Sequence, residues 1–413
     1  MAFPAPAALR DRNFLIYTIG NAISWLGSWA QRIGVGWLSW SLTHKTSWVG
    51  LISLAQILPL IVFGPLFGAL LDRYDHRRYA MLVNAVLGVL ALGLYALTAL
   101  HWMNIGLLLV LALFLGLGNS AYQAARLAMV NDVVAPQLLP QAIAANSIFY
   151  NLTRAIGPAI AGVIIARWGL QTAFAVNAVS FLGIIGALST VQLRAVPPRR
   201  SRGGVLADSR EGLRYVLTHP GMRQVLLLTV IVQILARGVI ELMPAFADAV
   251  FHRGSVGLAD LTTAMGVGAM GGALILARVG STSRLPVVTQ QATIAVGVLV
   301  ALFGLCHGFT LALLLAVVMG FAQVLCSVGL QVLLQSTIHD HYRGRVLGLW
   351  TASNVAGPGV GGALLGVAAQ RAGLGLVTVV AGLLCAALVM AIMPSGRLQL
   401  SRGLGPRVHP VER

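Results

Sequence analysis

Long apolar stretches recur along the whole chain, and short polar segments separate them. A helix of about 20 residues is long enough to cross the ~30 Å hydrocarbon core of a bilayer. Every backbone polar group in that core needs an internal partner, which favours helices. The pattern predicts an all-α integral membrane protein with twelve transmembrane helices, over residues 14–41, 48–71, 79–100, 104–127, 141–166, 171–192, 223–250, 258–279, 286–306, 309–335, 346–369 and 373–393.

One polar and basic segment interrupts this rhythm between the sixth and seventh stretches. Residues 194–223 are rich in arginine and contain three prolines, so they are expected to link two six-helix bundles. Their middle, residues 205–217, is predicted to form a short amphipathic helix on the membrane surface. The expected organisation is an N-terminal bundle (1–192), a cytoplasmic linker (193–222), a C-terminal bundle (223–395) and a cytoplasmic tail (396–413).

A weak internal repeat supports two related halves. The segment AIGPAIAG at residues 155–162 resembles VAGPGVGG at residues 355–362, in the corresponding stretch of the second half. Such repeats are typical of secondary transporters, and small residues at this spacing let helices approach closely. We therefore expect a helix-packing role for Gly157, Pro158, Gly162, Gly357, Pro358, Gly361 and Gly362.

Composition and charge agree with a membrane protein and predict its orientation. The chain is 58% hydrophobic and 9% charged, whereas about 25% of the residues in an average soluble domain are charged. The formal net charge is +17, nearly all of it from arginine. With the N-terminus in the cytoplasm, 21 arginines fall at cytoplasmic ends and loops, against four cationic residues outside. Because cytoplasmic loops are enriched in Lys and Arg, both termini are predicted to lie in the cytoplasm, with the protein in the cytoplasmic (inner) membrane.

The sequence also argues against several other function classes. We see no soluble basic domain that would bind nucleic acid. Lys45 is the only lysine and does not follow a glycine, which excludes a phosphate-binding loop of the G-x-x-x-x-G-K type. The cysteines Cys306, Cys326 and Cys385 lie far apart in apolar stretches, so neither a metal site nor a disulfide is expected. Since there is no H-E-x-x-H motif and no acidic metal cluster, we expect no enzyme activity and no cofactor.

The loop after the second apolar stretch carries a specific motif. It reads GALLDRYDHRR over residues 68–78, and it resembles the signature loop of the major facilitator superfamily. The resemblance implies the major facilitator fold, with two pseudo-symmetric six-helix bundles, and a conformational-switch role for this loop. In such a switch Asp72 would cap a helix of the opposite half, and the arginines would pair with nearby carboxylates. The alternative is that the arginines only anchor the topology. The matching residues are Gly68, Asp72, Arg73, Arg77 and Arg78, while Asp75 stands where the family usually has glycine.

Further segments resemble the exporter branch of this superfamily that includes the enterobactin exporter and macrolide efflux proteins. Gly157, Pro158 and Gly162 are similar to the antiporter motif of drug–proton exporters. The resemblance implies proton-coupled export of a drug-like or siderophore-like small molecule by alternating access, by a monomer in the lipid bilayer. A lipid flippase or an uncoupled facilitator on the same fold is the alternative. The segments that carry the resemblance are residues 25–43, 146–162 and 241–248.

Four charged residues fall at membrane depth, namely Arg32, Arg154, Arg237 and Glu241. Charges there are costly, so each is a functional candidate. A proton-coupled antiporter needs a carboxylate that exchanges between water and a drier cavity, and Glu241 has the right type and depth. Alternatively, Glu241 pairs with Arg237 one turn earlier, or with Arg32 across the cavity as an external gate. The resemblance implies that the first helices of the two halves approach each other there.

The central cavity is expected to be positively charged. Three arginines against one acid leave about two positive charges, which favours an anionic or phenolate-like substrate over a lipophilic cation. Trp37 and Trp40 are expected to be interfacial anchors, and Pro244 is predicted to kink its helix. The cavity-lining candidates are Arg154, Asn151, Gln31, Trp29 and Gln233, although polar residues at this depth also serve as contacts between helices.

Overall fold

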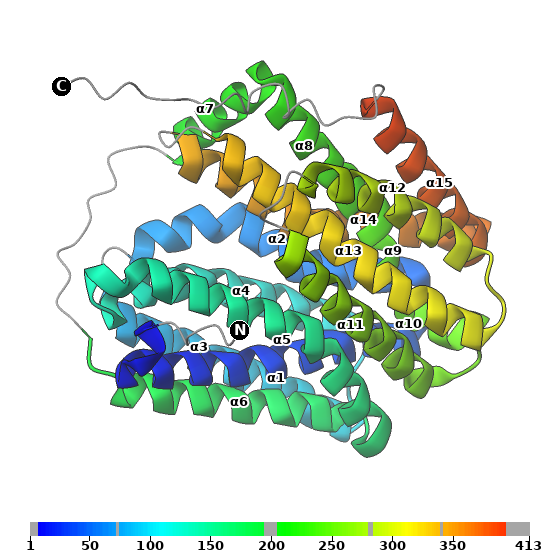
Figure 1. The fold of residues 1–413 in the computed structure, drawn as a ribbon. Helices are drawn as coiled ribbons and strands as arrows, with labels where there is room; N and C mark the ends of the chain where they lie inside the picture. The colour runs from blue at the N-terminus through cyan, green and yellow to red at the C-terminus, as the bar shows by residue number, and fades with distance from the viewer. Residues whose placement is uncertain (1–6, 72–73, 194–204, 280–283, 339–341, 394–413) are drawn as a thin grey trace, which may run out of the picture.

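The computed structural model describes residues 7–71, 74–193, 205–279, 284–338 and 342–393. Every regular element in these ranges is a helix (Figure 1). Among the residues that the sequence singles out, Asp72, Arg73 and the side chains of Asn151 and Arg154 lie outside the described part.

The first half of the chain forms six long helices. A 3-10 turn, η1 (Ala7–Arg10), precedes them, and a second one, η2 (Pro136–Leu138), lies before the fifth. The six helices are α1 (Arg12–Thr43), α2 (Thr46–Leu71), α3 (His76–Ala99), α4 (Ile105–Val133), α5 (Leu139–Trp168) and α6 (Leu170–Thr190).

The second half begins after the short helix α7 (Val205–Thr218), which the sequence predicts over residues 205–217. Six long helical units follow, so the prediction of an all-α chain with twelve membrane-length helices is confirmed. The first unit runs over Pro220–Val250 and consists of α8 (Pro220–Ile231), η3 (Val232–Ala236), α9 (Arg237–Glu241), α10 (Met243–Ala245) and η4 (Phe246–Val250). The others are α11 (Gly254–Val279), α12 (Leu285–Gly304), α13 (Phe309–Thr337), α14 (Arg343–Ala372) and α15 (Leu374–Ile392).

Corresponding turns in the two halves have the same backbone conformation. Gly169 joins α5 to α6 with φ 86°, and Gly373 joins α14 to α15 with φ 90°. Glycine adopts these angles without the steric penalty that a Cβ would bring. The pseudo-repeat therefore extends from the Gly-Pro segments to the turns that end their helices.

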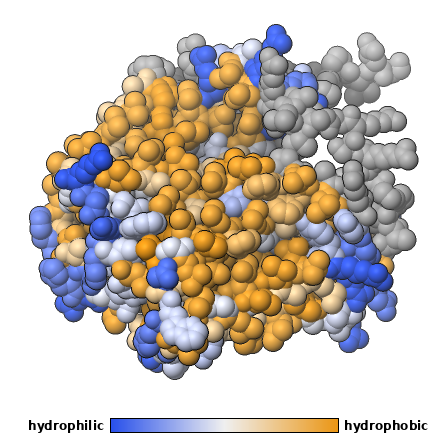
Figure 2. Space-filling view, turned by 180° about the vertical axis from the view of Figure 1, so that it is seen from behind, coloured by the Kyte–Doolittle hydropathy of each residue, from blue (hydrophilic) through white to orange (hydrophobic). Residues whose placement is uncertain are grey.

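A broad apolar band lies on the surface of the molecule, with many exposed large hydrophobic side chains. Figure 2 shows a broad hydrophobic surface between hydrophilic patches at either end of the bundle. By length and composition, nine helical units of the described chain qualify as membrane spans. The helices α1, α5 and α14 all pack against helices of the opposite half.

Each half has its own apolar core. Phe14, Leu87 and Phe174 are fully buried in the first half, and Phe246 and Phe303 in the second. Between the cores, the halves meet along α1, α2 and α5 on one side and the Pro220–Val250 unit, α11 and α14 on the other. We call the end of the bundle where α1 ends and α2 begins the closed side, because the two halves touch there. The end where α1 begins and α7 lies is the linker side, where the ribbons of the two halves diverge in Figure 1.

Candidate functional site

The helical unit that carries Glu241 is irregular at the depth of this residue. Val232–Ala236 and Phe246–Val250 are π-helical, and the regular helix is broken at Leu242. Pro244 has no N–H to give to the carbonyl of Ile240, and its ring crowds that carbonyl, so the α-helix cannot continue regularly here. The break agrees with the kink that Pro244 predicts, and π segments of this kind occur often at functional sites.

The carboxylate of Glu241 joins the two halves. Arg32 Nη2 on α1 donates to Glu241 Oε1 at 2.7 Å, and Ser53 Oγ on α2 donates to Glu241 Oε2 at 2.8 Å. Both oxygens of this second-half acid are thus held by the first half. The Glu241 side chain is 17% exposed and that of Arg32 39% exposed. The carboxylate is therefore shielded, while the guanidinium remains accessible from the cavity.

Glycines allow α14 to pack closely against α2 and α9 beside this contact. A Cβ placed on Gly362 would lie 3.0 Å from Glu241 Cβ, and one placed on Gly50 of α2 would collide with the carbonyl oxygen of Gly362. A Cβ on Gly238 would lie 2.6 Å from the carbonyl carbon of Gly361. The helix α14 is therefore wedged between α2 and α9 with backbone touching backbone, which small residues permit.

Further contacts join the two halves on the closed side, beyond Glu241. Trp40 Nε1 donates to Asp248 Oδ2 at 2.8 Å, and His44 Nδ1 lies 3.7 Å from the same oxygen. Thr46 Oγ1 donates to the carbonyl oxygen of Gly366 at 2.7 Å. The expectation that Trp40 is an interfacial anchor is wrong, since Trp40 is only 5% exposed and its indole N–H bonds across the halves.

A cavity of about 750 Å³ lies between the halves, and Glu241 stands in its wall. Helices α1 and α5 of the first half and α11 and α13 of the second contribute most of the lining. Trp29, Arg32 and Arg237 also line it, so these three sequence candidates meet there. The guanidinium of Arg32 lies 5.6 Å from the ring centre of Trp29, in cation–π range.

The structure places two other cavity candidates elsewhere. Gln31 Oε1 accepts a hydrogen bond from Asn177 Nδ2 of α6 at 2.8 Å. Gln233 Nε2 donates to Asn354 Oδ1 of α14 at 2.6 Å. Both glutamines are buried contacts between helices of the same half, and neither lines the central cavity. Each lies at the expected depth, but its helix turns the side chain away from the cavity.

The signature loop makes its described contacts inside the first half. Arg77 donates to the carbonyl oxygen of Ser189 at the end of α6, where a cation compensates the helix dipole. Asp75 Oδ1 accepts from the backbone N–H of Arg78 at 2.8 Å and so caps α3. A Cβ on Gly68 would meet open space. The capping of an opposite helix by Asp72 concerns a residue outside the described ranges and stays a prediction.

The Gly-Pro segments lie in the helices that pack across the halves. A Cβ on Gly157 would lie 2.6 Å from the Trp29 ring, and one on Gly162 would lie 2.6 Å from Ala259 Cα on α11. In the second half, a Cβ on Gly357 would lie 2.5 Å from Gln233 Cβ. Pro158 and Pro358 both lie inside their helices. These contacts agree with the expected packing role.

Sequence reasoning did not find several residues of the site. Ser53 binds Glu241, yet it lies in an apolar stretch that gives no signal of its own. Gln323 of α13 lines the cavity and is not marked by any motif. On the linker side, His76 Nδ1 lies 2.6 Å from the buried carboxylate of Asp132; this pair joins α3 to α4 within one half.

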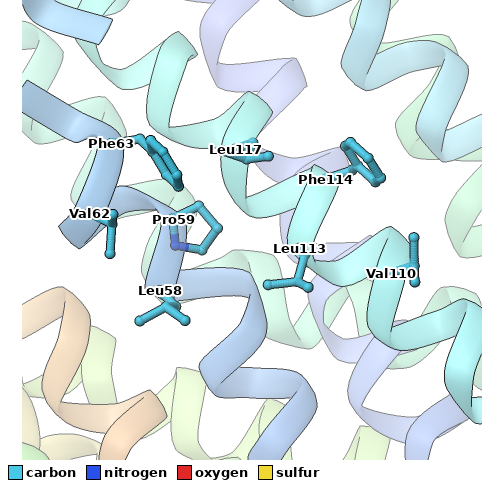
Figure 3. A pocket seen from close by; sticks show the side chains of 8 residues that line it. All are labelled: Leu58, Pro59, Val62, Phe63, Val110, Leu113, Phe114 and Leu117. Atoms are coloured by element: carbon cyan, nitrogen blue, oxygen red, sulfur yellow. The ribbon is translucent and has the colours of Figure 1, made fainter. Parts of the chain in front are cut away.

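A second hollow on the surface has a different character. Figure 3 shows a groove between α2 and α4, lined by side chains such as Leu58, Val62 and Phe114. These three side chains are exposed, and all eight lining residues are apolar. The groove belongs to the lipid-facing band and contains no group that would bind a polar solute.

Comparison with known proteins agrees with this architecture. The sequence pattern of the transmembrane secretion effector family matches residues 4–402. Two relatives, both called enterobactin exporter EntS, are 28% identical (Escherichia coli O81, strain ED1a) and 27% identical (Shigella flexneri) over 326 residues, which is 79% of this chain and 77% of theirs.

Solved transporter structures share the fold at low sequence identity. A bacterial homologue of the human lysosomal transporter Spinster superposes with a TM-score of 0.71 at 13% identity, covering 97% of this chain and 98% of that one. The nucleoside transporter NupG gives 0.63 at 14% identity, covering 93% and 98%. The match over nearly the whole chain and the shared fold show that the protein belongs to the transmembrane secretion effector family of the major facilitator superfamily, and is a multi-pass membrane efflux transporter rather than an enzyme.

Proposed function

We propose that this protein is a proton-coupled exporter of a drug-like or siderophore-like small molecule, acting as a monomer in the cytoplasmic membrane by alternating access. The relatives called enterobactin exporter support export of a small molecule. The unequal distribution of arginine supports a cytoplasmic position for both termini and for the linker side. On this orientation the contacts of Glu241, Asp248 and Gly366 with the first half lie toward the outside, and the cavity extends toward the cytoplasm, to Leu276 and Val332.

The observation that carries the proposal is the position of Glu241. It is an acid of the second half whose two oxygens are held by α1 and α2 of the first half, at the wall of the central cavity. The strength of the contact between the two halves therefore depends on whether the Glu241 carboxylate carries a charge. In the ionised form it attracts Arg32 and holds the closed side together.

Alternating access then follows from charge and desolvation. When the outer side is open, an ionised Glu241 has to lose water before the halves can close on it, and a proton removes most of that cost. After closure the cavity faces the cytoplasm, the proton leaves, and the ion pair with Arg32 forms. Each return of the empty transporter thus carries a proton inward, which is the exchange that a proton-driven exporter needs.

The test is proton exchange in everted membrane vesicles acidified by respiration. A naphthalenesulfonate, rhodamine 6G and a catechol are added in turn, and a pH-sensitive dye reports proton efflux from the vesicles. Wild-type vesicles are expected to show proton efflux with at least one compound, and Glu241→Gln is expected to abolish it. The control is Asp260→Asn, which removes an exposed acid from the start of α11 and is expected to leave the exchange unchanged.

Other results would replace the proposal. Exchange that persists in Glu241→Gln would remove this residue as the proton carrier. Movement of a compound without any proton signal would identify an uncoupled facilitator. Transfer of a fluorescent phospholipid between leaflets, with none of the small molecules moved, would identify a lipid flippase.

A further inference from the structure

The wall of the central cavity combines a large apolar surface with cations. Helices α11 and α13 supply Met265, Met270, Leu274, Val324 and Val328, and α5 adds further aliphatic side chains. Among the described residues that line the cavity, Arg32 and Arg237 carry positive charge and Glu241 carries negative charge. The formal balance of these three residues is one positive charge, in a space lined mostly by apolar side chains. A cavity of about 750 Å³ is of the size that binds small organic molecules.

The guanidinium of Arg32 retains hydrogen-bonding capacity toward the cavity. It has five N–H donors, and Glu241 Oε1 accepts from Nη2. The side chain is 39% exposed and lies over the ring of Trp29. A ligand group next to this cation would therefore also lie next to an aromatic face.

An uncharged hydrogen-bonding group, the amide of Gln323, faces the same space. Gln323 of α13 is only 6% exposed and lines the cavity. Within the described structure its amide nitrogen Nε2 is buried and has no hydrogen-bond acceptor. A buried donor without an acceptor costs free energy, so an acceptor supplied by a ligand would be favoured here.

We infer that the substrate is an amphipathic organic anion, whose carboxylate, sulfonate or phenolate binds Arg32, Arg237 and Gln323 and whose hydrocarbon or aromatic part lies on the wall formed by α11 and α13. The inference rests on the proposed function and names the substrate class of the same site. The guanidinium of Arg32 and the amide nitrogen of Gln323 are hydrogen-bond donors, so an anionic acceptor binds them and a cation does not, and the positive charge of Arg237 adds to the attraction. The methionines of the wall suit apolar groups of varied shape.

Binding of an anionic substrate would also affect the carboxylate that is proposed to carry the proton. An anion beside Arg32 competes with the Glu241 carboxylate for the positive charge of the same guanidinium, because the two negative charges repel each other. Substrate binding from the cytoplasm would then weaken the contact that holds the closed side together. An anionic substrate would in this way favour the outward opening that releases it.

Binding of three naphthalene probes tests the inference without any transport step. The purified protein in phosphatidylcholine nanodiscs is titrated calorimetrically with 1-naphthalenesulfonate, 1-naphthalenemethanol and (1-naphthylmethyl)ammonium. The ring is the same, so the charge decides the ranking. The anion is expected to bind about tenfold tighter than the alcohol, and the cation more weakly than the alcohol.

Variants are expected to change the affinity for the anion in opposite directions. Arg237→Gln should weaken it about tenfold, and Gln323→Leu less, while the affinity for the alcohol stays unchanged. Glu241→Gln should tighten anion binding by about threefold or more, because it removes the competitor for Arg32. Arg167→Gln is the control, since it removes the same charge from an exposed position at the end of α5.

Several results would overturn the substrate class. The substrate class is wrong if the wild-type protein binds the alcohol or the cation at least as tightly as the anion, whatever the variants show. It is also wrong if Arg237→Gln still binds the alcohol and its affinity for the anion is unchanged. If the Arg237→Gln protein no longer binds the alcohol either, we take the variant to be misfolded. The Arg237→Lys variant, which keeps the positive charge, is then titrated in its place. It should still bind the anion more tightly than the alcohol. If the vesicles show no proton exchange but the purified protein still binds the anion most tightly, the proposed proton-coupled function is wrong and the substrate class is retained.

Discussion

The helices α5 and α14 occupy corresponding positions in the two halves and make corresponding contacts. The first glycine of each Gly-Pro segment packs on the first long helical unit of its own half, Gly157 on Trp29 and Gly357 on Gln233. The last glycines differ: the Cα of Gly162 faces Ala259 of α11 in the opposite half, whereas the Cα of Gly362 faces Glu241 of its own half and its carbonyl oxygen meets Gly50 of α2. Each Gly-Pro helix therefore touches the opposite half through a glycine, but in a different way.

The chemistry at the two contacts differs. Beside α14, the ionisable Glu241 packs on Gly362 and is bonded by Arg32 and Ser53. Beside α5, the described polar contact is a long one, from Thr262 Oγ1 to the carbonyl oxygen of Pro158 at 3.4 Å. The α2–α14 contact thus includes a charged group, while the α5–α11 contact consists mainly of packing in the described residues.

The largest effect is expected from a side chain placed between α2 and α14. Gly50→Val puts a bulky group against the backbone of Gly362 and Ala363, neither of which can give way cheaply. Overpacking of this kind costs about 1–3 kcal/mol, enough to shift the equilibrium toward opening of the closed side about tenfold to a hundredfold. Spin labels at the exposed positions Lys45 and Arg371, at the closed ends of α2 and α14, report the opening as a longer distance.

Two glycine variants serve as comparisons for this experiment. Gly162→Ala, at the equivalent contact on Ala259, should also open the closed side, but less, since a single methyl group is added. Gly93→Ala in α3 is the control, because a Cβ there meets nothing within 4 Å. The same distance distribution in Gly50→Val as in Gly93→Ala would contradict the view that close backbone contact holds the halves together.

The sequence predicts the depth of a side chain much better than its direction. Twelve apolar stretches correspond to twelve long helical units, nine of which have the length and hydropathy of a membrane span over the described residues. Arg32 and Glu241 were expected at the same depth, and the structure brings them to 2.7 Å. Gln31, one residue before Arg32, was expected in the cavity and instead faces α6.

The reason is that neighbouring residues on a helix point about 100° apart. A helix that is apolar on all sides carries no periodic pattern to show which face turns inward. Polar residues in such helices are either contacts between helices or cavity groups, and composition cannot separate the two. Ser53 was missed for the same reason, because its contact with Glu241 depends on how α2 is rotated.

A smaller effect is expected from the charge of the contact. Arg32→Gln removes the cation that Glu241 binds, and it should favour opening of the closed side about tenfold, since hydrogen bonds to charged groups are stronger than neutral ones. The double variant Arg32→Glu/Glu241→Arg, which exchanges the two charges, should restore closure of this side. The distance between the same two spin labels measures it. A double variant that stays as open as Arg32→Gln would show that the attraction between these two residues is not what holds the closed side together.

Hydroxyl groups at the two equivalent contacts give a sharper comparison. Ser53→Ala removes a donor to an ionised carboxylate and should shift the equilibrium about fivefold toward opening. Thr262→Val removes the donor to Pro158 at 3.4 Å, a weak hydrogen bond, and should change the distances little. Equal effects in the two variants would remove the asymmetry inferred between the α2–α14 and α5–α11 contacts.

The smallest effect is expected at the outer end of the closed side. Trp40→Phe keeps an aromatic ring in this buried position but removes the indole N–H that bonds Asp248 at 2.8 Å. Because Asp248 is about one-third exposed, water can replace the lost donor, and opening should increase only about two- to threefold. The Trp40→Phe and Arg32→Gln effects should add if the two contacts act independently. A combined effect clearly larger or smaller than the sum would instead show that Asp248 and Glu241 respond as one unit of the Pro220–Val250 helix.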